Sequence, residues 1–288
     1  MFMHLEINIT GFCFLIGILG LVIGSFINVV IHRLPIMLTQ QWQQESANYL
    51  NIKLADPQPT TTLNLFLPRS HCPNCHETIK FYDNIPILSY FILAGRCRYC
   101  QKTISRLYPL VELLCCLLAV AVAIRFGITW QTFFAVILTW SLICLAFIDL
   151  KNFILPDSIT LPILWLGLFA NLYAVFTDIN SAILGAFIGY LLLWSVFHIF
   201  FFLRQKEGLG YGDFKLFALL GAWLGWQLLP LILLLASFIG AIIYLPLIAL
   251  KKHRVAAPIP FGPHIALAGY IALIYGNTIV NWYLNSLS

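Results

Sequence analysis

Two acidic residues at the ends of apolar runs are the leading candidates for chemistry in this sequence. Asp149 ends one apolar run, whereas Asp213 closes the glycine-rich stretch 208–213 and precedes another run, 64 positions further on. An acid at such an edge is costly, which favours a functional site, although a solvated boundary carboxylate is the simpler alternative for each residue alone.

The setting of each acid indicates what chemistry the two could perform together. Asp149 lies at the carboxyl end of a predicted helix, where the helix dipole disfavours an anion, and this suits it to handling a proton. Gly208, Gly210 and Gly212 would let backbone or a peptide strand approach Asp213 closely. Two carboxyls at one desolvated edge cannot both ionise easily. One could therefore activate water while the other, still protonated, polarises a carbonyl, as in aspartic peptide hydrolysis.

A second set of reactive side chains consists of two Cys-x-x-Cys pairs. The pairs are Cys72 with Cys75 and Cys97 with Cys100. Four thiolates at this spacing indicate a structural zinc site, with 21 residues between the pairs rather than the usual 15–20. A redox dithiol is the alternative, but the βαβ context of a thioredoxin is missing. We expect the neighbouring His71 and His76 to be solvated.

The elements that must position these residues are membrane helices. The chain is 61% hydrophobic and 9% charged, with a mean hydropathy of +0.90, against about 25% charged in a soluble domain. The sequence predicts an all-α polytopic membrane protein with about eight transmembrane helices and a small cytoplasmic zinc-binding loop domain between the first two. The expected spans are 12–31, 109–124, 132–148, 159–176, 182–202, 214–229, 231–250 and 265–284.

The basic residues predict the orientation. Of the 16 lysines and arginines, all except Arg125 fall in or beside gaps of one parity, so the long first loop should be cytoplasmic and both termini should face outward. Asp149 and Asp213 would then lie at the same cytoplasmic edge. The net charge of +5 thus reflects the orientation of the chain in the membrane. We expect a lipid bilayer as partner and no nucleic acid.

Several other polar residues leave alternatives open. Asn28 should find an interhelical partner. Glu112 is either a buried functional acid or the partner of an arginine such as Arg106. Asp157 fits an acid that satisfies helix N-terminal amides. His264 is a weaker candidate for reaching the acidic site. Residues 37–67 are interpreted as a loop or small cytoplasmic element, and no internal repeat stands out.

Taken together, these motifs resemble the bacterial type IV prepilin peptidases, also called leader peptidase/N-methyltransferases. The resemblance covers nearly the whole chain. It runs through residues 24–35, the cysteine pairs around 84–90, and residues 108–114, 149–157, 208–215 and 260–269.

The resemblance implies a function, two cofactors and a set of site residues. Its catalytic aspartates fall on Asp149 and Asp213, and its zinc thiolates on the four cysteines above. It implies cleavage of type IV prepilins and type II secretion pseudopilins after the glycine of their leader, in the bacterial inner membrane. N-methylation of the new N-terminal residue with S-adenosylmethionine would follow, in a region that includes Gly95.

The same resemblance divides the chain into three regions. These are the first transmembrane helix (1–32), a methyltransferase-associated zinc region (33–107) and the peptidase domain (108–288). Other functions stay open from the residues alone: an ion-coupled transporter, a non-catalytic scaffold, or a glycine-aspartate intramembrane protease without methyltransferase activity. The transporter would place charges near mid-bilayer and carry an inverted repeat.

Overall fold

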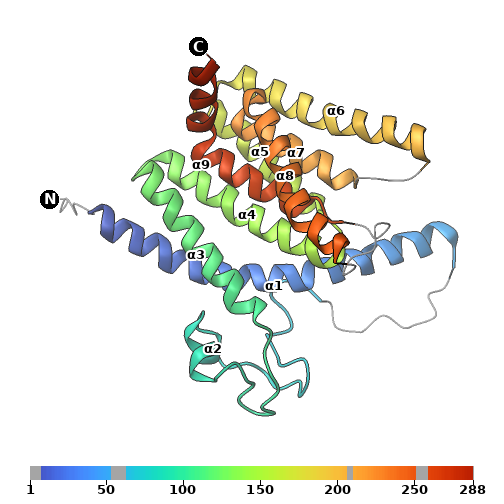
Figure 1. The fold of residues 1–288 in the computed structure, drawn as a ribbon. Coiled ribbons are helices and arrows are strands. Elements are labelled where there is room, and N and C mark those ends of the chain that lie inside the picture. The colour runs from blue at the N-terminus through green and yellow to red at the C-terminus, as the bar shows by residue number, and fades with distance from the viewer. Residues whose placement is uncertain (1–7, 53–62, 206–209, 251–258, 288) are drawn as a thin grey trace. The chain divides into compact units, whose positions relative to one another are not determined.

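The computed structural model describes residues 8–52, 63–205, 210–250 and 259–287. In these residues the regular structure is helical, with two isolated bridges and no strand. The helices are α1 (Ile9–Leu50), η1 (Phe81–Asn84), α2 (Leu88–Ile92), α3 (Leu107–Phe126), α4 (Trp130–Asn152), α5 (Asp157–Asn171), α6 (Ile179–Arg204), α7 (Tyr211–Leu224), η2 (Trp226–Leu228), α8 (Leu229–Ala249) and α9 (Gly262–Leu287). The predicted all-α class is confirmed (Figure 1). Gly208 and Leu209 of the glycine-rich stretch, and the basic residues Lys53, Lys206, Lys251, Lys252 and Arg254, lie outside the described residues.

The number of spans differs from the prediction. Each of the eight expected spans falls on one helix, but among the described residues only six helices are long and apolar enough to cross a membrane. The two others, α5 and α7, have 15 and 14 residues. At 1.5 Å per residue these helices are shorter than a hydrocarbon core of about 30 Å. From Phe214 to Leu224 α7 is buried almost throughout, so it is a core helix of the bundle.

The first helix is longer than expected. The prediction of a loop from residue 37 is wrong for its first part, because α1 continues through Pro35 to Leu50. The segment after Pro35 contains no glycine or proline and has four glutamines, which are good helix formers. The helix ends where Asn51 adopts a left-handed conformation and its N–H bonds back to Ala47.

The chain divides into two compact units, residues 1–124 and 125–288. In the first unit, α1 and α3 pack through glycines. A Cβ at Gly20 would lie 2.7 Å from the Cys115 carbonyl oxygen, and one at Gly24 would lie 2.7 Å from the Glu112 Cα. Asn28 has the interhelical partner that its burial predicts, since its Nδ2 donates to the Tyr108 carbonyl at 3.0 Å.

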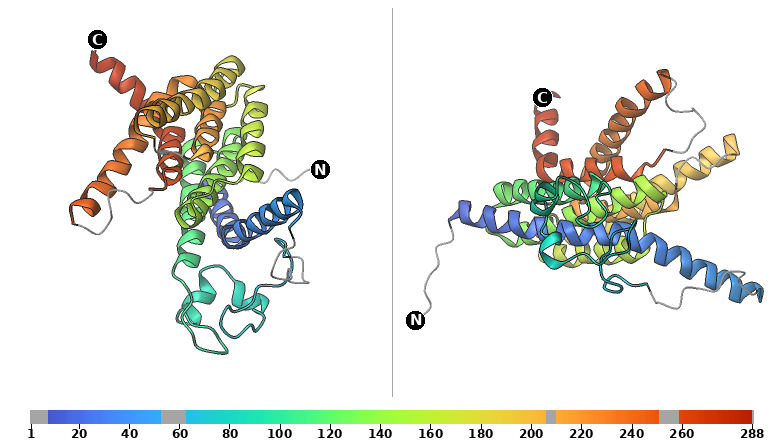
Figure 2. Two further views of the ribbon diagram at one scale, coloured as in Figure 1. Left: turned by 90° about the vertical axis from the view of Figure 1, so that its right-hand side faces the viewer. Right: turned by 90° about the horizontal axis from the view of Figure 1, so that it is seen from below.

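The second unit is built around α7, which α5, α6 and α9 contact (Figures 1 and 2). The backbones of α6 and α7 touch where Gly185 faces Gly221, and a side chain on either glycine would collide with the opposite carbonyl. Asn171, at the end of α5, donates through Nδ2 to the Ala222 and Trp223 carbonyls at 2.9 Å. These bonds satisfy carbonyls at the end of α7 that the helix itself leaves free.

The glycine contact yields a stability prediction. Gly221→Ala should force α6 and α7 apart and cost about 2 kcal/mol, which would lower the Tm of the purified protein in detergent by about 5 °C. Gly11→Ala is the matched control, because a Cβ at Gly11 meets nothing within 4 Å. Equal melting of both variants and the wild type would show that the two helices do not meet at Gly221.

Candidate active site and cysteine cluster

Asp149 is held at the end of α4 by the start of α9. It lies in the last turn of α4 with 6% of its surface exposed. Its Oδ2 accepts the backbone N–H of Gly262 at 3.1 Å, across 113 positions of sequence. A Cβ at Gly262 would lie 2.7 Å from that oxygen, so the amide can reach the carboxylate only from a glycine.

Asp213 is held within the first turn of α7 and is equally buried, at 6% exposed. Its Oδ2 accepts the N–H of Gly210 at 3.0 Å, and its own N–H donates to the Gly210 carbonyl at 3.1 Å. This reciprocal arrangement is typical of a helix N-terminus, where the dipole stabilises an anion. Sequence reasoning missed the bond, although the three-residue spacing from Gly210 to Asp213 signals it.

Leu155 brings the two carboxyl-bearing turns together. A Cβ at Gly212 would lie 2.7 Å from the Leu155 Cβ, and one at Gly262 would lie 3.2 Å from its Cδ1. The start of α7 and the start of α9 therefore both pack against this one side chain. The structure thus brings the turns that carry two acids, from separate helices, against the same residue. No signal in the sequence distinguished Leu155 from the other apolar residues.

A salt bridge fixes α7 beside this site. Lys215 Nζ donates to both oxygens of Asp157 at 2.7 Å. Asp157 is the first residue of α5, as predicted, but its carboxylate makes no capping bond to the helix amides. The prediction of an acid at this helix N-terminus is confirmed, but its two oxygens bind the ammonium group of Lys215 rather than the helix amides.

His264 lies near the site without a described bond to either acid. It is 4% exposed, two residues beyond Gly262. Its ring packs edge-on against Tyr244, with centroids 5.6 Å apart, and lies over Phe261. Within the described residues its Nδ1 has no hydrogen-bond partner. The structure thus places the histidine close by and leaves the prediction of a role untested.

The four cysteines form one cluster in the loop between α1 and α3. All four Sγ atoms lie within 4.8 Å of one another, and the separations between Cys72 and Cys100 and between Cys75 and Cys97 are 3.8 and 4.0 Å. A tetrahedral site with metal–sulfur bonds of about 2.3 Å needs sulfur atoms about 3.8 Å apart. The cluster therefore has the geometry to hold a metal ion. His71 and His76 are exposed, as expected.

The two cysteine pairs are copies of one local fold, 25 residues apart. In the first copy, the His76 N–H donates to the Cys72 carbonyl, and the Cys72 N–H donates to the Glu77 carbonyl. In the second copy, the Gln101 N–H donates to the Cys97 carbonyl, and the Cys97 N–H donates to the Lys102 carbonyl. His76 and Gln101 share a φ of 58°. No internal repeat was expected, yet residues 72–79 and 97–104 share both this backbone geometry and the pattern Cys-x-x-Cys-x-x-Thr-Ile.

Backbone amides prepare two of the sulfurs for a metal. An N–H bond from Lys102 lowers the pKa of Cys100 to about 6, and one from Cys75 lowers the pKa of Cys72. Both shifts favour thiolates, the form that binds metal. The two sulfurs come from different pairs, so each half of the repeat contributes one. At Cys75 a backbone bond from Glu77 also lowers the pKa, but burial and the neighbouring thiols outweigh this bond and raise the pKa to about 12.

Glu112 and Gly95 border the cysteine loop. Glu112 is 7% exposed and its Oε2 accepts the N–H of Ile87 at 2.8 Å. No ion pair with Arg106 occurs in the described residues, so the acid is buried without that partner, and a functional role for it stays a prediction. Gly95 has a φ of +67°, and a Cβ there would lie 2.9 Å from the ring of Tyr90.

Comparisons with known proteins agree with this arrangement. Residues 18–126 match the family model described as the bacterial peptidase A24 N-terminal domain, and residues 136–245 match the type IV leader peptidase family. A prepilin leader peptidase/N-methyltransferase of Aeromonas hydrophila is 53% identical over 94% of this chain and 93% of its own length. Proteins with the same name from Pseudomonas aeruginosa and Legionella pneumophila are 48% and 43% identical, over 93% and 97% of this chain and 91% and 97% of their own lengths. No solved structure gives a significant match.

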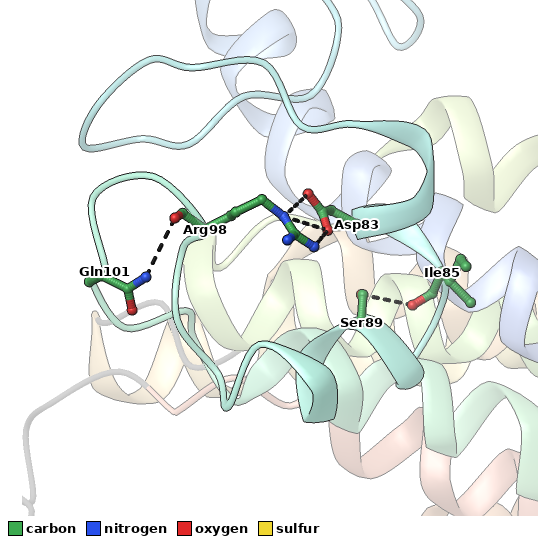
Figure 3. Close-up of polar contacts among 5 residues, drawn as sticks. All are labelled: Asp83, Ile85, Ser89, Arg98 and Gln101. Carbon is green, nitrogen blue, oxygen red and sulfur yellow. Dashed lines mark hydrogen bonds and ion pairs between the residues drawn. The ribbon is translucent and has the colours of Figure 1, made fainter.

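The ion pair between Asp83 and Arg98 gives the cysteine loop a pH-dependent stability (Figure 3). Arg98 Nε donates to both carboxylate oxygens, at 3.1 and 2.9 Å, and this lowers the pKa of Asp83 below its ordinary value. A lowered folded-state pKa means that the pair stabilises the loop above about pH 4 and that this contribution is lost as the pH falls through the lower pKa.

Asp83→Asn should therefore reduce amide-exchange protection of residues 85–95 about threefold at pH 7. The variant and the wild type should converge in acid. Glu77→Gln removes an exposed acid from the same loop and serves as the control. A difference that persists unchanged below pH 3 would show that charge is not the cause.

Proposed function

The chain belongs to the type IV leader peptidase family, and we propose that it cleaves the leader peptides of type IV prepilins and pseudopilins and then N-methylates the new N-terminal residue. The observation that carries the peptidase proposal is the convergence of Asp149 and Asp213 around Leu155. Both carboxyls are buried and each is oriented by a backbone amide of a glycine. Preorganised acids of this kind are what peptide hydrolysis requires.

In the proposed mechanism each aspartate uses one oxygen for its backbone bond. The bonds from Gly262 and Gly210 each occupy an Oδ2, so the Oδ1 atoms can serve water and substrate. The ionised aspartate takes a proton from water, and the water oxygen attacks the carbonyl carbon of the leader's last glycine. The protonated aspartate donates to the carbonyl oxygen and, when the C–N bond breaks, a proton passes to the leaving amine.

The basic residues support a cytoplasmic site in the bacterial inner membrane. We propose that the cysteine loop and both aspartates face the cytoplasm, since 15 of the 16 basic residues fall on that side by parity. Substrates with a short basic leader would keep it in the cytoplasm while the following apolar helix enters the bilayer. The scissile bond would then lie at the membrane edge, beside Asp149 and Asp213.

We further propose that the four cysteines hold a structural zinc ion. The observed sulfur separations fit tetrahedral coordination, and four protein ligands leave no open position for catalysis. The loop has little apolar core, so metal binding would supply much of its folding free energy.

The three proposed regions assign separate tasks along the chain. The proposed regions are a first membrane helix (1–32), a zinc-binding region associated with methylation (33–107) and a membrane-embedded peptidase domain (108–288), whose first turns border the methylation region. S-adenosylmethionine is the proposed methyl donor, and Gly95 belongs to its region. The names of the relatives include N-methyltransferase, which favours this function over a glycine-aspartate protease that only cleaves.

The catalytic assignment predicts the effect of removing either acid. Asp149→Asn and Asp213→Asn should each lower the rate of prepilin cleavage about 1,000-fold, because an amide cannot exchange the required proton, while membrane insertion is unchanged. Purified protein and one prepilin, followed by mass spectrometry, give the measurement. Asp178→Asn is the matched control, since asparagine caps α6 as well as the aspartate does. Cleavage by either site variant at the control's rate would reject the pair.

The zinc assignment predicts the metal content. Wild-type protein should contain about one zinc ion per chain, and Cys97→Ser should lose it, because three thiolates and a hydroxyl bind zinc far less tightly. Cys13→Ser changes a cysteine of α1 and should retain the metal. Equal zinc in both variants would contradict a site made by the four cysteines.

A further inference from the structure

A cavity of about 660 Å³ lies inside the first unit and has no role in the cleavage site. Its walls come from α1, from the start of α3 and from the loop that carries the cysteines. Polar and aromatic residues of the lining include Asn28, Tyr90, Lys102, Tyr108 and Glu112. The volume falls within the range of about 300–1,000 Å³ that small-molecule sites occupy.

A strained turn lies between the lining residues Asn84 and Ser89 in the sequence, and Glu112 holds it in place. Ile87 has φ 61° and ψ −51°, and the N–H of Leu88 bonds to the Pro86 carbonyl across it. A β-branched residue rarely adopts a positive φ, and such strain is concentrated at functional sites. The Ile87 N–H donates to Glu112 Oε2 at 2.8 Å. The carboxylate thereby fixes the turn and also forms part of the cavity wall.

Other polar groups of the wall are equally well positioned. The Ser25 hydroxyl interacts with the Glu112 carboxylate, and Asn28 bonds to the Tyr108 carbonyl. Lys102 Nζ donates to Asn74 Oδ1 at 2.9 Å, which uses one of its three donors. The cavity lining therefore contains an acidic side chain, Glu112, and a basic one, Lys102, and each is held by a hydrogen bond.

The same wall has flat aromatic surface. Tyr90 and Tyr108 line the cavity, and the Tyr90 ring is packed against Gly95, where a side chain would displace it. Aromatic faces attract organic cations and stack on flat heterocycles. A carboxylate, an ammonium group and aromatic faces together match an adenosyl amino acid that carries a sulfonium charge.

We propose that this cavity is the methyl-transfer site: it binds S-adenosylmethionine, and Glu112 accepts the proton of the N-terminal amine that is methylated. The proposal rests on the methyltransferase function proposed above. Lys102 would bind the carboxylate of the donor and the tyrosines its sulfonium and adenine groups. Glu112 lies in the second turn of α3, near its cytoplasmic end, where the freed amine of a substrate helix would arrive.

The step balances without any further reactant. The substrate's ammonium group transfers one proton to Glu112, and the nitrogen lone pair then bonds to the donor's methyl carbon. The carbon–sulfur bond breaks and its electron pair stays on sulfur, which becomes neutral. The product is a monomethylated ammonium group, and Glu112 returns its proton to water.

Glu112→Gln tests the proposal, because glutamine keeps an oxygen for the Ile87 N–H but cannot accept the proton. With purified enzyme, one prepilin and labelled donor, we expect methylation to fall about 100-fold. Cleavage, which other residues perform, reports that the variant is folded. Glu45→Gln is the matched control, since Glu45 is an exposed acid of α1 whose described partner is Gln41.

A second measurement depends on binding alone. Ultraviolet cross-linking of labelled S-adenosylmethionine to the wild-type protein, competed by S-adenosylhomocysteine, should label peptides within residues 25–36 or 70–112. Label in residues 125–288, or methylation by Glu112→Gln at the rate of the control, would overturn the assignment of the cavity while leaving the methyltransferase function intact. If the wild type methylates no prepilin, the proposed methyltransferase function itself fails.

Discussion

The contact of Leu155 with two glycines is the constraint on which the acidic site depends. Gly212 and Gly262 each lack the Cβ that would collide with this side chain, or with the Asp149 carboxylate. The starts of α7 and α9 can therefore approach the turn that follows α4. The start of α7 carries Asp213, and the start of α9 carries the Gly262 amide that binds Asp149. Because close packing transmits small displacements, a methyl group at either glycine would separate the carboxyls.

The first unit also holds a buried carboxylate with a backbone amide, although this acid lies outside the cleavage site. Glu112 fixes the strained turn at Ile87, and the paired cysteine turns form a module whose geometry suits a metal. Both units thus place buried carboxylates against backbone amides, which satisfies the acids without neutralising them by a base. A buried acid held by neutral donors remains able to accept or give a proton, whereas a salt bridge such as that of Asp157 with Lys215 fixes its charge.

The sequence alone predicted the all-helical class and the cysteine cluster, because hydropathy and paired thiols are local signals. The location of the two acids at one membrane edge stays a prediction. The sequence did not predict Leu155, whose role depends on glycines 57 and 107 positions away. It did not predict that Asp157 binds Lys215, because this partner is 58 positions distant. The count of about eight spans is not confirmed for α5 and α7, because both helices are short, and the burial of α7 inside the bundle leaves no mark on hydropathy.

The most direct test of the central claim measures whether Asp149 and Asp213 face one another in the membrane. In the double variant Asp149→Cys/Asp213→Cys, a short bifunctional thiol reagent should link the two introduced cysteines, and peptide mapping should identify that link beside any involving native cysteines. Each single variant should lack it. If both introduced thiols react with a monofunctional reagent of similar size but the link never forms, the two carboxyls do not share a substrate and the account is contradicted.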